Sequence, residues 1–244
     1  MKTVAIIQAR MGSTRLPGKV LMEIAGKPML QHVIERAQRI QGVDQVIVAT
    51  TNKPDDVAVV ELASRLTVAT YCGDEDDVLS RYAEAAAVHN AETIVRLTGD
   101  CPLLDPSCAS LVLGVHRAYR AQGLDPYVSN IYPVRTWPRG YDTEVFSAAL
   151  LGRADAETRL LSSGAAYRYH REHVTPWMQR TTIAGVTGRV ISRVAFDIWA
   201  DAAFTVNVTN PHGDESAENL SVDTLEDLAR VRRYAGELAL GAGR

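Results

Sequence analysis

Short apolar runs alternate with stretches of helical periodicity through the first half of this chain. Runs that predict strands occupy residues 3–9, 43–50, 67–71 and 93–97, and helical periodicity predicts helices at residues 28–40, 54–66, 76–89 and 106–121. The first run is almost entirely apolar, as in a strand that is buried on both faces. This alternation predicts an α/β fold, in which helices cover both faces of a mostly parallel sheet.

The pattern changes after Gly123. Residues 126–145 contain several prolines and glycines, which predict irregular structure with short strands that either extend the sheet or form a small subdomain. A helix is predicted at 165–179, broken or bent near Pro176, followed by strands at 185–194 and 204–209. The last predicted helix, at 224–240, begins after a cap at Asp223 or Thr224. We expect one domain over residues 1–244, with residues 126–180 as a small insertion.

The composition argues against several classes of protein. Apolar residues make up 46% of the chain and charged residues 23%, and the formal net charge is -3. Such a surface has no general attraction for nucleic acid or for an anionic membrane. The N-terminal apolar run is too short for a signal peptide, no stretch approaches the ~20 apolar residues of a membrane span, and the three cysteines form no CxxC pair. We therefore expect a cytoplasmic protein that binds anions through a local cluster of bases.

The loop that follows the first predicted strand is rich in cations. It carries Arg10, Arg15 and Lys19 with no acidic residue among them, and its glycines and hydroxyl residues are Gly12, Ser13, Thr14 and Gly18. Ligands of open α/β sheets bind at the carboxyl ends of strands, and several donors together suit a triphosphate. The loop matches neither the Walker A motif nor G-x-G-x-x-G. The alternative interpretation is a solvated basic turn.

Two aspartates follow predicted apolar segments. Asp100 comes after the strand at 93–97, and Asp223 precedes the last helix. A turn residue and a helix cap are the ordinary roles of aspartate at such places. The other interpretation is a metal site, because magnesium takes one or two carboxylates together with phosphate oxygens.

A series of motifs resembles one enzyme family over nearly the whole chain. The segment IIQARMGSTRLPGKVL at residues 6–21 is the most specific, and IAGKPML, DVLSRY, RLTGDCPL, PRGYDTEV, REHVT and VD with EDL follow it in order. These motifs resemble the cytidylyltransferases that activate acid sugars, the CMP-KDO and CMP-acylneuraminate synthetases. The greatest likeness is to the branch named for spore coat polysaccharide biosynthesis protein F.

The resemblance implies a GT-A-type (Rossmann-like) fold, a homodimer and a Mg²⁺-dependent transfer of CMP from CTP to an acid sugar or related small anionic acceptor, with release of pyrophosphate. It implies Asp100 and Asp223 as metal ligands and Arg10, Arg15 and Lys19 as catalytic residues that stabilise the leaving pyrophosphate. The residues that would bind the nucleotide are Ala9, Arg10, Gly12, Ser13, Lys19, Gly73, Arg81 and Thr98. Those that would bind the acceptor are Arg139, Asp142, Glu144, Arg171 and His173, and the insertion at 126–180 would bind the acceptor or form the dimer.

This chain departs from the family at two positions. Many relatives carry an acidic residue where Arg139 stands, and many carry an arginine where Asn219 stands. A phosphonate or a polyol phosphate is therefore as compatible with the sequence as an acid sugar. Two further alternatives are a GT-A glycosyltransferase, which consumes a nucleotide sugar, and a catalytically silent nucleotide-binding homologue.

Overall fold

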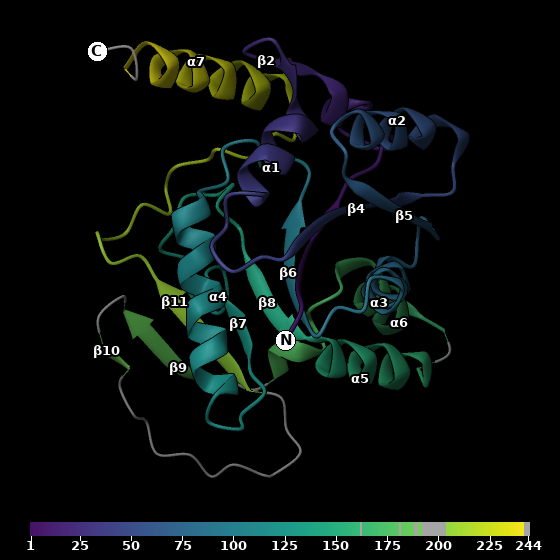
Figure 1. Cartoon of the computed structure of the whole chain (residues 1–244), viewed down its shortest axis with the longest axis vertical. Helices are drawn as coiled ribbons and strands as arrows, with labels where there is room; N and C mark the ends of the chain where they lie inside the picture. The colour runs from purple at the N-terminus through teal and green to yellow at the C-terminus, as the bar shows by residue number, and fades with distance from the viewer. Residues whose placement is uncertain (162, 181, 188–189, 192–203, 242–244) are drawn as a thin grey trace.

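The computed structural model describes residues 1–161, 163–180, 182–187, 190–191 and 204–241. In this described part, nine strands form one sheet in the order β10-β9-β11-β7-β8-β6-β1-β4-β5 (Figure 1). Their bounds are β1 Thr3–Gln8, β4 Gln45–Thr51, β5 Ala69–Gly73, β6 Thr93–Thr98, β7 Tyr127–Ser129, β8 Glu144–Ser147, β9 Thr182–Thr187, β10 Val190–Ile191 and β11 Thr205–Thr209. The neighbours β6, β1, β4 and β5 run parallel, and β8 is antiparallel to both β6 and β7.

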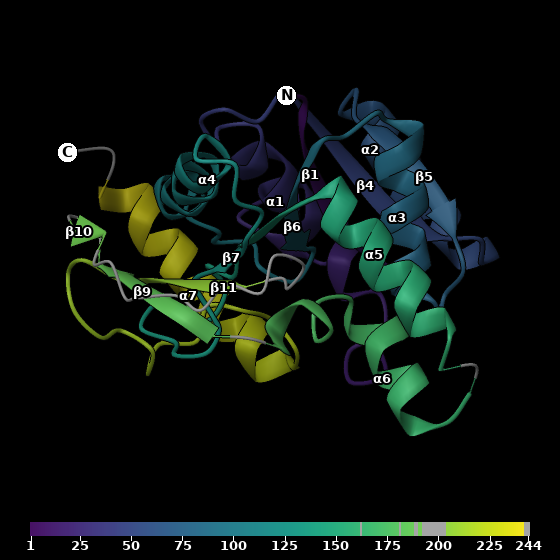
Figure 2. The same cartoon turned by 90° about the horizontal axis from the view of Figure 1, so that it is seen from below.

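Helices cover both faces of this sheet (Figures 1 and 2). The strands alternate, so Ala5 and Ile7 of β1 belong to a core cluster with residues of α1 (Met29–Ala37), α2 (Val57–Arg65) and α4 (Pro106–Arg120). Val4 and Ile6 belong to the opposite cluster, with residues of α3 (Val78–Val88) and α5 (Ala148–Arg159). Burying one such aliphatic side chain contributes about 1.5–3 kcal/mol, so both faces stabilise the sheet.

A third, smaller cluster lies beside the sheet. It joins α7 (Leu225–Gly241) to the hairpin of β2 (Glu23–Ile24) and β3 (Lys27–Pro28) through Ile24, Leu228 and Val231. Three one-turn helices complete the described elements, namely η1 (Lys19–Leu21), η2 (Pro54–Asp56) and η3 (Met178–Arg180). Among the described residues, none of the helices combines the length and apolar character that a bilayer span requires.

The α/β architecture predicted from the sequence is confirmed, and residues 126–180 share its sheet and core. β7 and β8 extend the central sheet, which is one of the two arrangements predicted for 126–145. α5, which the periodicity did not predict, begins after Ser147, whose hydroxyl accepts a hydrogen bond from the Leu150 amide. The helical segment predicted at 165–179 is broken near Pro176, one of the two predicted forms, because α6 (Ala165–His173) ends before that residue and η3 follows it. The single strand predicted at 185–194 is wrong: β9 begins at Thr182 and ends at Thr187, and β10 pairs with it in the antiparallel direction, while residues 192–194 lie outside the described part.

Candidate active site

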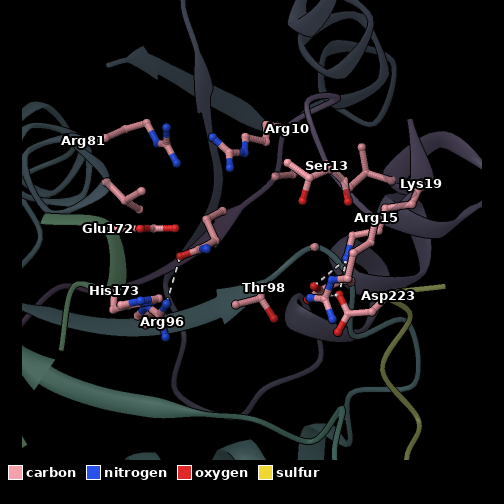
Figure 3. A pocket seen from close by; sticks show the side chains of 17 residues that line it. Arg10, Ser13, Arg15, Lys19, Arg81, Arg96, Thr98, Glu172, His173 and Asp223 are labelled. Atoms are coloured by element: carbon pink, nitrogen blue, oxygen red, sulfur yellow. Dashed lines mark hydrogen bonds and ion pairs between the residues drawn. The ribbon is translucent and has the colours of Figure 1, made fainter. Parts of the chain in front are cut away.

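A cavity of about 320 Å³ opens where β1 and β6 end (Figure 3). Its walls come from the first loop, the start of α3, the end of α6 and the segment before α7. Arginine and lysine side chains dominate its charged lining, which includes Arg10, Arg15, Lys19, Arg81 and Arg96. The carboxylates that line it are Asp100, Glu172 and Asp223. A cavity with this excess of cations suits an anionic ligand.

Lys19 joins the two aspartates at one corner of the cavity. Its Nζ donates to Asp100 Oδ2 at 2.9 Å, to Asp223 Oδ1 at 2.8 Å and to the Val222 carbonyl at 2.7 Å. Arg15 Nη2 lies 2.8 Å from the same Asp223 oxygen. Burial alone would lower the pKa of Lys19, but the two carboxylates raise it above its ordinary value, so the ammonium stays charged. Burial likewise opposes charge on Asp100, and the ammonium of Lys19 nevertheless holds the pKa of that carboxyl below its ordinary value.

Local backbone geometry places both aspartates. A Cβ atom at Gly99 would lie 2.9 Å from Ala9 Cβ, so only glycine allows the turn that carries Asp100 to lie this close to the end of β1. Thr224, one of the two predicted caps, exchanges hydrogen bonds with Asp227 as in a capping box: its hydroxyl accepts from the Asp227 amide, and the Asp227 carboxylate accepts from the Thr224 amide. The carboxylate of Asp223 is thereby left to Lys19 and Arg15.

The opposite end of the first loop faces α3. Arg10 Nη1 lies 3.2 Å from Glu75 Oε1, and the second oxygen of Glu75 lies 2.9 Å from Lys53 Nζ. Arg81 is buried, which lowers its pKa, and its Nη1 donates to the Asp74 carbonyl at 2.7 Å. Arg10 and Arg81 point toward the same space in Figure 3.

Six of the eight residues predicted to bind the nucleotide line the cavity. They are Ala9, Arg10, Ser13, Lys19, Arg81 and Thr98. Gly12 and Gly73 do not line it in the described part of the chain, because they lie against the side chains of Glu75 and Arg81. A Cβ atom would lie 3.0 Å from Glu75 Oε1 at Gly12 and 3.0 Å from Arg81 Cγ at Gly73. These two glycines give room to neighbouring side chains.

Of the five residues predicted to bind the acceptor, only His173 lines the cavity as the described residues bound it. Arg171 is almost fully buried between Asp77 and Asp155, at 2.7 Å from each. Asp142 forms a two-bond ion pair with Arg135 at 2.6 and 2.9 Å. Glu144 is buried beside Arg96. These positions differ from the expectation because each charge is engaged by a partner within the protein.

Arg139 lies on the exposed surface, beside the other departure from the family. Its backbone pairs with the segment around Asn219: the Arg139 amide donates to Glu218 O at 2.9 Å, and Leu220 donates to Arg139 O at 2.7 Å. The next residue, Gly140, has φ 102°, and a Cβ there would lie 2.7 Å from the Leu220 carbonyl carbon. The PRG motif thus serves a close backbone contact.

Three polar residues that line the cavity were missed from the sequence, namely Gln8, Arg96 and Glu172. Arg96 lies within β6, between Ile94 and Thr98 on one face of the strand. An arginine inside a strand expected to be buried on both faces was the signal that could have identified it, because such residues are rarely buried without a partner.

Comparison with known proteins identifies the family. The model of a family described as Cytidylyltransferase matches residues 4–197. An uncharacterized protein of Methanocaldococcus jannaschii is 36% identical over 178 residues, which are 73% of this chain and 67% of that protein. The 3-deoxy-manno-octulosonate cytidylyltransferase of Solibacter usitatus is 42% identical over 99% of this chain and 98% of its own length. The chain spans 42% of the enzyme of that name from Geobacter sulfurreducens, at 44% identity over 44% of this chain.

Two solved structures share the fold. A cytidylyltransferase from Leptospira borgpetersenii superposes with a TM-score of 0.77 at 31% identity, over 95% of this chain and 85% of that one. A CMP:2-keto-3-deoxy-manno-octonic acid synthetase complexed with CTP superposes with a TM-score of 0.65 at 20% identity, over 97% and 99% of the two chains. The second likeness concerns the fold alone.

Proposed function

The chain belongs to the cytidylyltransferase family, and from this premise we propose that it transfers CMP from CTP to an acid sugar and releases pyrophosphate. One observation carries the proposal: Lys19, Asp100 and Asp223, which are far apart in the sequence, meet at one corner of a cation-lined cavity. The names of relatives that act on 3-deoxy-manno-octulosonate support an acid sugar as the acceptor. We place the chain nearest to the spore coat polysaccharide F branch on the motifs described above, which would make polysaccharide biosynthesis its setting.

The reaction we propose is an in-line displacement. An oxygen of the acceptor forms a bond to the α-phosphorus of CTP as the bond from that phosphorus to the bridging oxygen breaks, and pyrophosphate leaves with the bond's electron pair. Arg10, Arg15 and Lys19 bind the phosphates and stabilise the negative charge that grows on the leaving group. The acceptor's hydroxyl proton passes to solvent.

The donor set at Asp100 and Asp223 fits Mg²⁺. Two carboxylates from distant segments already share one ammonium, so their oxygens face a common cation position. No group of three or more His, Cys, Asp or Glu able to hold a metal occurs among the described residues, and two carboxylates completed by phosphate oxygens are a usual magnesium set. A bound Mg²⁺ would polarise the α-phosphate and favour deprotonation of the attacking hydroxyl.

The nucleobase belongs, in this proposal, at the end of the cavity near α3. Arg81 lies there, and its Nη1 donates to the Asp74 carbonyl. Cytosine presents an amino donor and two acceptors, which a carbonyl and one or two N–H groups can satisfy. The preference for CTP follows from membership of the family.

We also propose that the protein acts in the cytoplasm as a homodimer. Its three cysteines are free, as in a reducing compartment. Leu160, the C-cap residue of α5, and Tyr169, in the middle of α6, expose 83% and 53% of their surface and offer apolar area to a second copy. Light scattering on the purified chain, with Leu160→Glu as a variant, tests the dimer.

A pyrophosphate-release assay tests the reaction. The protein, Mg²⁺ and each of the four nucleoside triphosphates are combined in turn with acid sugars, polyol phosphates and phosphonates. We expect release with CTP and 3-deoxy-manno-octulosonate or a related acid. Release with UTP or GTP but not CTP would overturn the choice of base. Release of pyrophosphate only with a polyol phosphate or a phosphonate would show that the acceptor belongs to that class and is not an acid sugar.

The same assay separates the other functions. A glycosyltransferase of this fold would consume a nucleotide sugar and would not liberate pyrophosphate from any triphosphate. Tight nucleotide binding, measured by calorimetry, without release from any pair would identify a silent homologue.

A further inference from the structure

One cation of the cavity has no role in the reaction described above. Arg96 lines the cavity, and Ile94, on the same face of β6, belongs to the core cluster beneath α3 and α5. Thr98, two residues later on that face, also lines the cavity. Along this face of β6, the side chains therefore change from core residues to cavity-lining residues at Arg96.

A buried network orients the guanidinium of Arg96. Its Nη1 donates to Glu144, its directly paired residue on β8, and its Nη2 donates to Gln8 Oε1 at 3.1 Å. The other oxygen of Glu144 accepts from the hydroxyls of Tyr127 and Thr175. Burial opposes the charged form of Arg96, but the Glu144 carboxylate raises the pKa of Arg96 above its ordinary value, so it remains a cation.

Arg96 retains donors that the protein does not use. An arginine has five N–H donors, and the hydrogen bonds above engage one on each Nη. Its Nε is buried without a hydrogen-bond partner among the described residues. The Nε is also closed to solvent, so a ligand in the cavity would accept from the remaining N–H groups of Nη1 and Nη2.

Arg171 shows what a purely structural arginine looks like in the same chain. Its side chain is 2% exposed, against 13% for Arg96, and its Nε and Nη2 both donate to the Asp77 carboxylate at 2.7 Å. Its Nη1 contacts the backbone oxygen of Asp155, the hydroxyl of Thr158 and the Asp155 carboxylate. All three nitrogens are engaged, and the side chain does not line the cavity in the described part of the chain.

The position of Arg96 in the cavity indicates which ligand it meets. Lys19, Arg15 and Asp223 form one corner, Arg81 lies at another, and Arg10 lies on the side between Ser13 and Arg81 (Figure 3). Arg96 is drawn on the side of the cavity that also carries Glu172 and His173, and Thr98 is drawn between Arg96 and Asp223 (Figure 3). With phosphates at the first corner and the base at the second, the side that carries Arg96 remains for the acceptor.

We propose that Arg96, held by Glu144 and Gln8, binds the anionic oxygens of the acceptor and selects acceptors that carry an acid group. The proposal rests on the transferase function proposed above. A carboxylate and a phosphoryl group both accept two hydrogen bonds from one guanidinium, and the experiments distinguish them.

Kinetics of two variants test the role. Arg96→Lys keeps the charge beside Glu144 and loses the planar fork, and Arg96→Gln loses both. With the acceptor found in the pyrophosphate assay, we expect the KM for acceptor to rise about tenfold to hundredfold, the range for one hydrogen bond to a charged group, and the KM for CTP to stay within about twofold. Arg65→Gln, at an exposed position on α2, is the matched control and should change neither constant. An unchanged KM for acceptor in both variants, or an equal rise of both constants, would overturn the proposal.

A spectroscopic measurement does not depend on turnover. The Nε–H signal of Arg96 is assigned in a ¹⁵N spectrum by its loss in Arg96→Lys, and the protein with bound CMP is then titrated with gluconate, glucitol phosphate or neutral glucitol. We expect gluconate or glucitol phosphate, or both, to shift the signal, and glucitol to leave it in place. The anion that acts identifies the acid group. A signal that no anion moves, or that glucitol moves equally, refutes the proposal. A response to anions without pyrophosphate release in any pair would refute the transferase function and leave the anion site standing.

Discussion

Two clusters of ion pairs lie at the same edge of the sheet and differ in their access to solvent. In the cluster around Lys19, the side chains of Asp100 and Asp223 are 30% and 29% exposed. In the cluster around Arg96, Glu144 is 2% exposed and accepts from Tyr127 and Thr175 as well. We call the cluster around Lys19 the exchangeable cluster, because its carboxylates can bind another cation in place of Lys19. We call the cluster around Arg96 the fixed cluster, because its buried ion pair cannot exchange a partner.

The difference follows from solvation. Water reaches the two carboxylates of the first cluster and can solvate them when their ion pairs open, although the shared Lys19 is only 9% exposed. A charge buried with its partner has no such alternative, and removing one member strands the other. A site that must take up and release a charged substrate therefore needs the first kind of cluster, and a site that must hold a side chain in place needs the second.

The largest effect is expected in the exchangeable cluster. Asp100→Asn removes a proposed magnesium ligand and one partner of Lys19, so turnover should fall about a thousandfold, or about 4 kcal/mol of transition-state stabilisation. Pyrophosphate release measures it, and Asp55→Asn, an exposed residue in the first turn of η2, is the control. Turnover at the unmodified rate would remove the metal role from Asp100.

Stability should respond most in the fixed cluster. Glu144→Gln leaves the guanidinium of Arg96 without its counter-charge, which should lower the free energy of unfolding by about 3 kcal/mol. Urea denaturation of the variant and of Asp100→Asn makes the comparison directly. If both lose equally, the contrast drawn between the clusters is wrong.

A buried histidine outside both clusters, His116, also contributes to the pH dependence of stability. Its contribution must be removed before acid unfolding can be used to compare the two clusters. Burial lowers the pKa of His116 from 6.5 to about 4. As the pH falls, the His116 imidazole of the unfolded chain binds a proton near pH 6.5, whereas the folded protein binds it only near pH 4. The free energy of unfolding should therefore decline by about 3 kcal/mol between pH 6.5 and 4. His116→Leu should flatten that range, as followed by urea denaturation at each pH. A slope that survives the substitution must come from another group.

Tyr127→Phe measures how much a single hydrogen bond contributes to the stability of the fixed cluster. The phenol donates to the buried Glu144, and its loss should cost about 1.5 kcal/mol, the lower end for a hydrogen bond to a charged group. Thermal unfolding is the measurement, with Tyr71→Phe as the control because the Tyr71–Glu84 hydrogen bond is exposed. A loss no larger than that of the control would show that the network is hydrated.

The smallest change in the free energy of unfolding is expected for an exposed ion pair. Lys27→Ala removes the pair with Glu35, whose side chains are 46% and 36% exposed. We expect a change of about 0.3 kcal/mol in the free energy of unfolding, measured in urea. A loss above about 1 kcal/mol, the upper end for exposed pairs, would mean that exposure alone does not separate weak from strong pairs in this protein.

The first half of the fold was predictable because its signals are local. Each parallel strand from β1 to β6 is a short apolar run, and each helix between them repeats its apolar residues at a helical period. The helix α5 was missed because its periodicity is weak and its N-cap, Ser147, is one hydroxyl residue among many. The residues of the candidate site differ in the same way. The cations of the first loop are contiguous in sequence and could be predicted from it. The positions of the residues proposed to bind the acceptor depend on the pairing between strands, which is not local.

The sequence by itself determined the alternation of strands and helices and the cation-rich loop at the end of β1, and its motifs carried the resemblance to the family, because these depend on residues close together in the chain. Only the tertiary structure decided which charges are free. The pairing of β6 with β8 places Arg96 opposite Glu144, and the packing of α6 places Arg171 between two aspartates. Whether a charged side chain serves the fold or a ligand depends on which partners long-range packing provides, and no spacing along the chain records that.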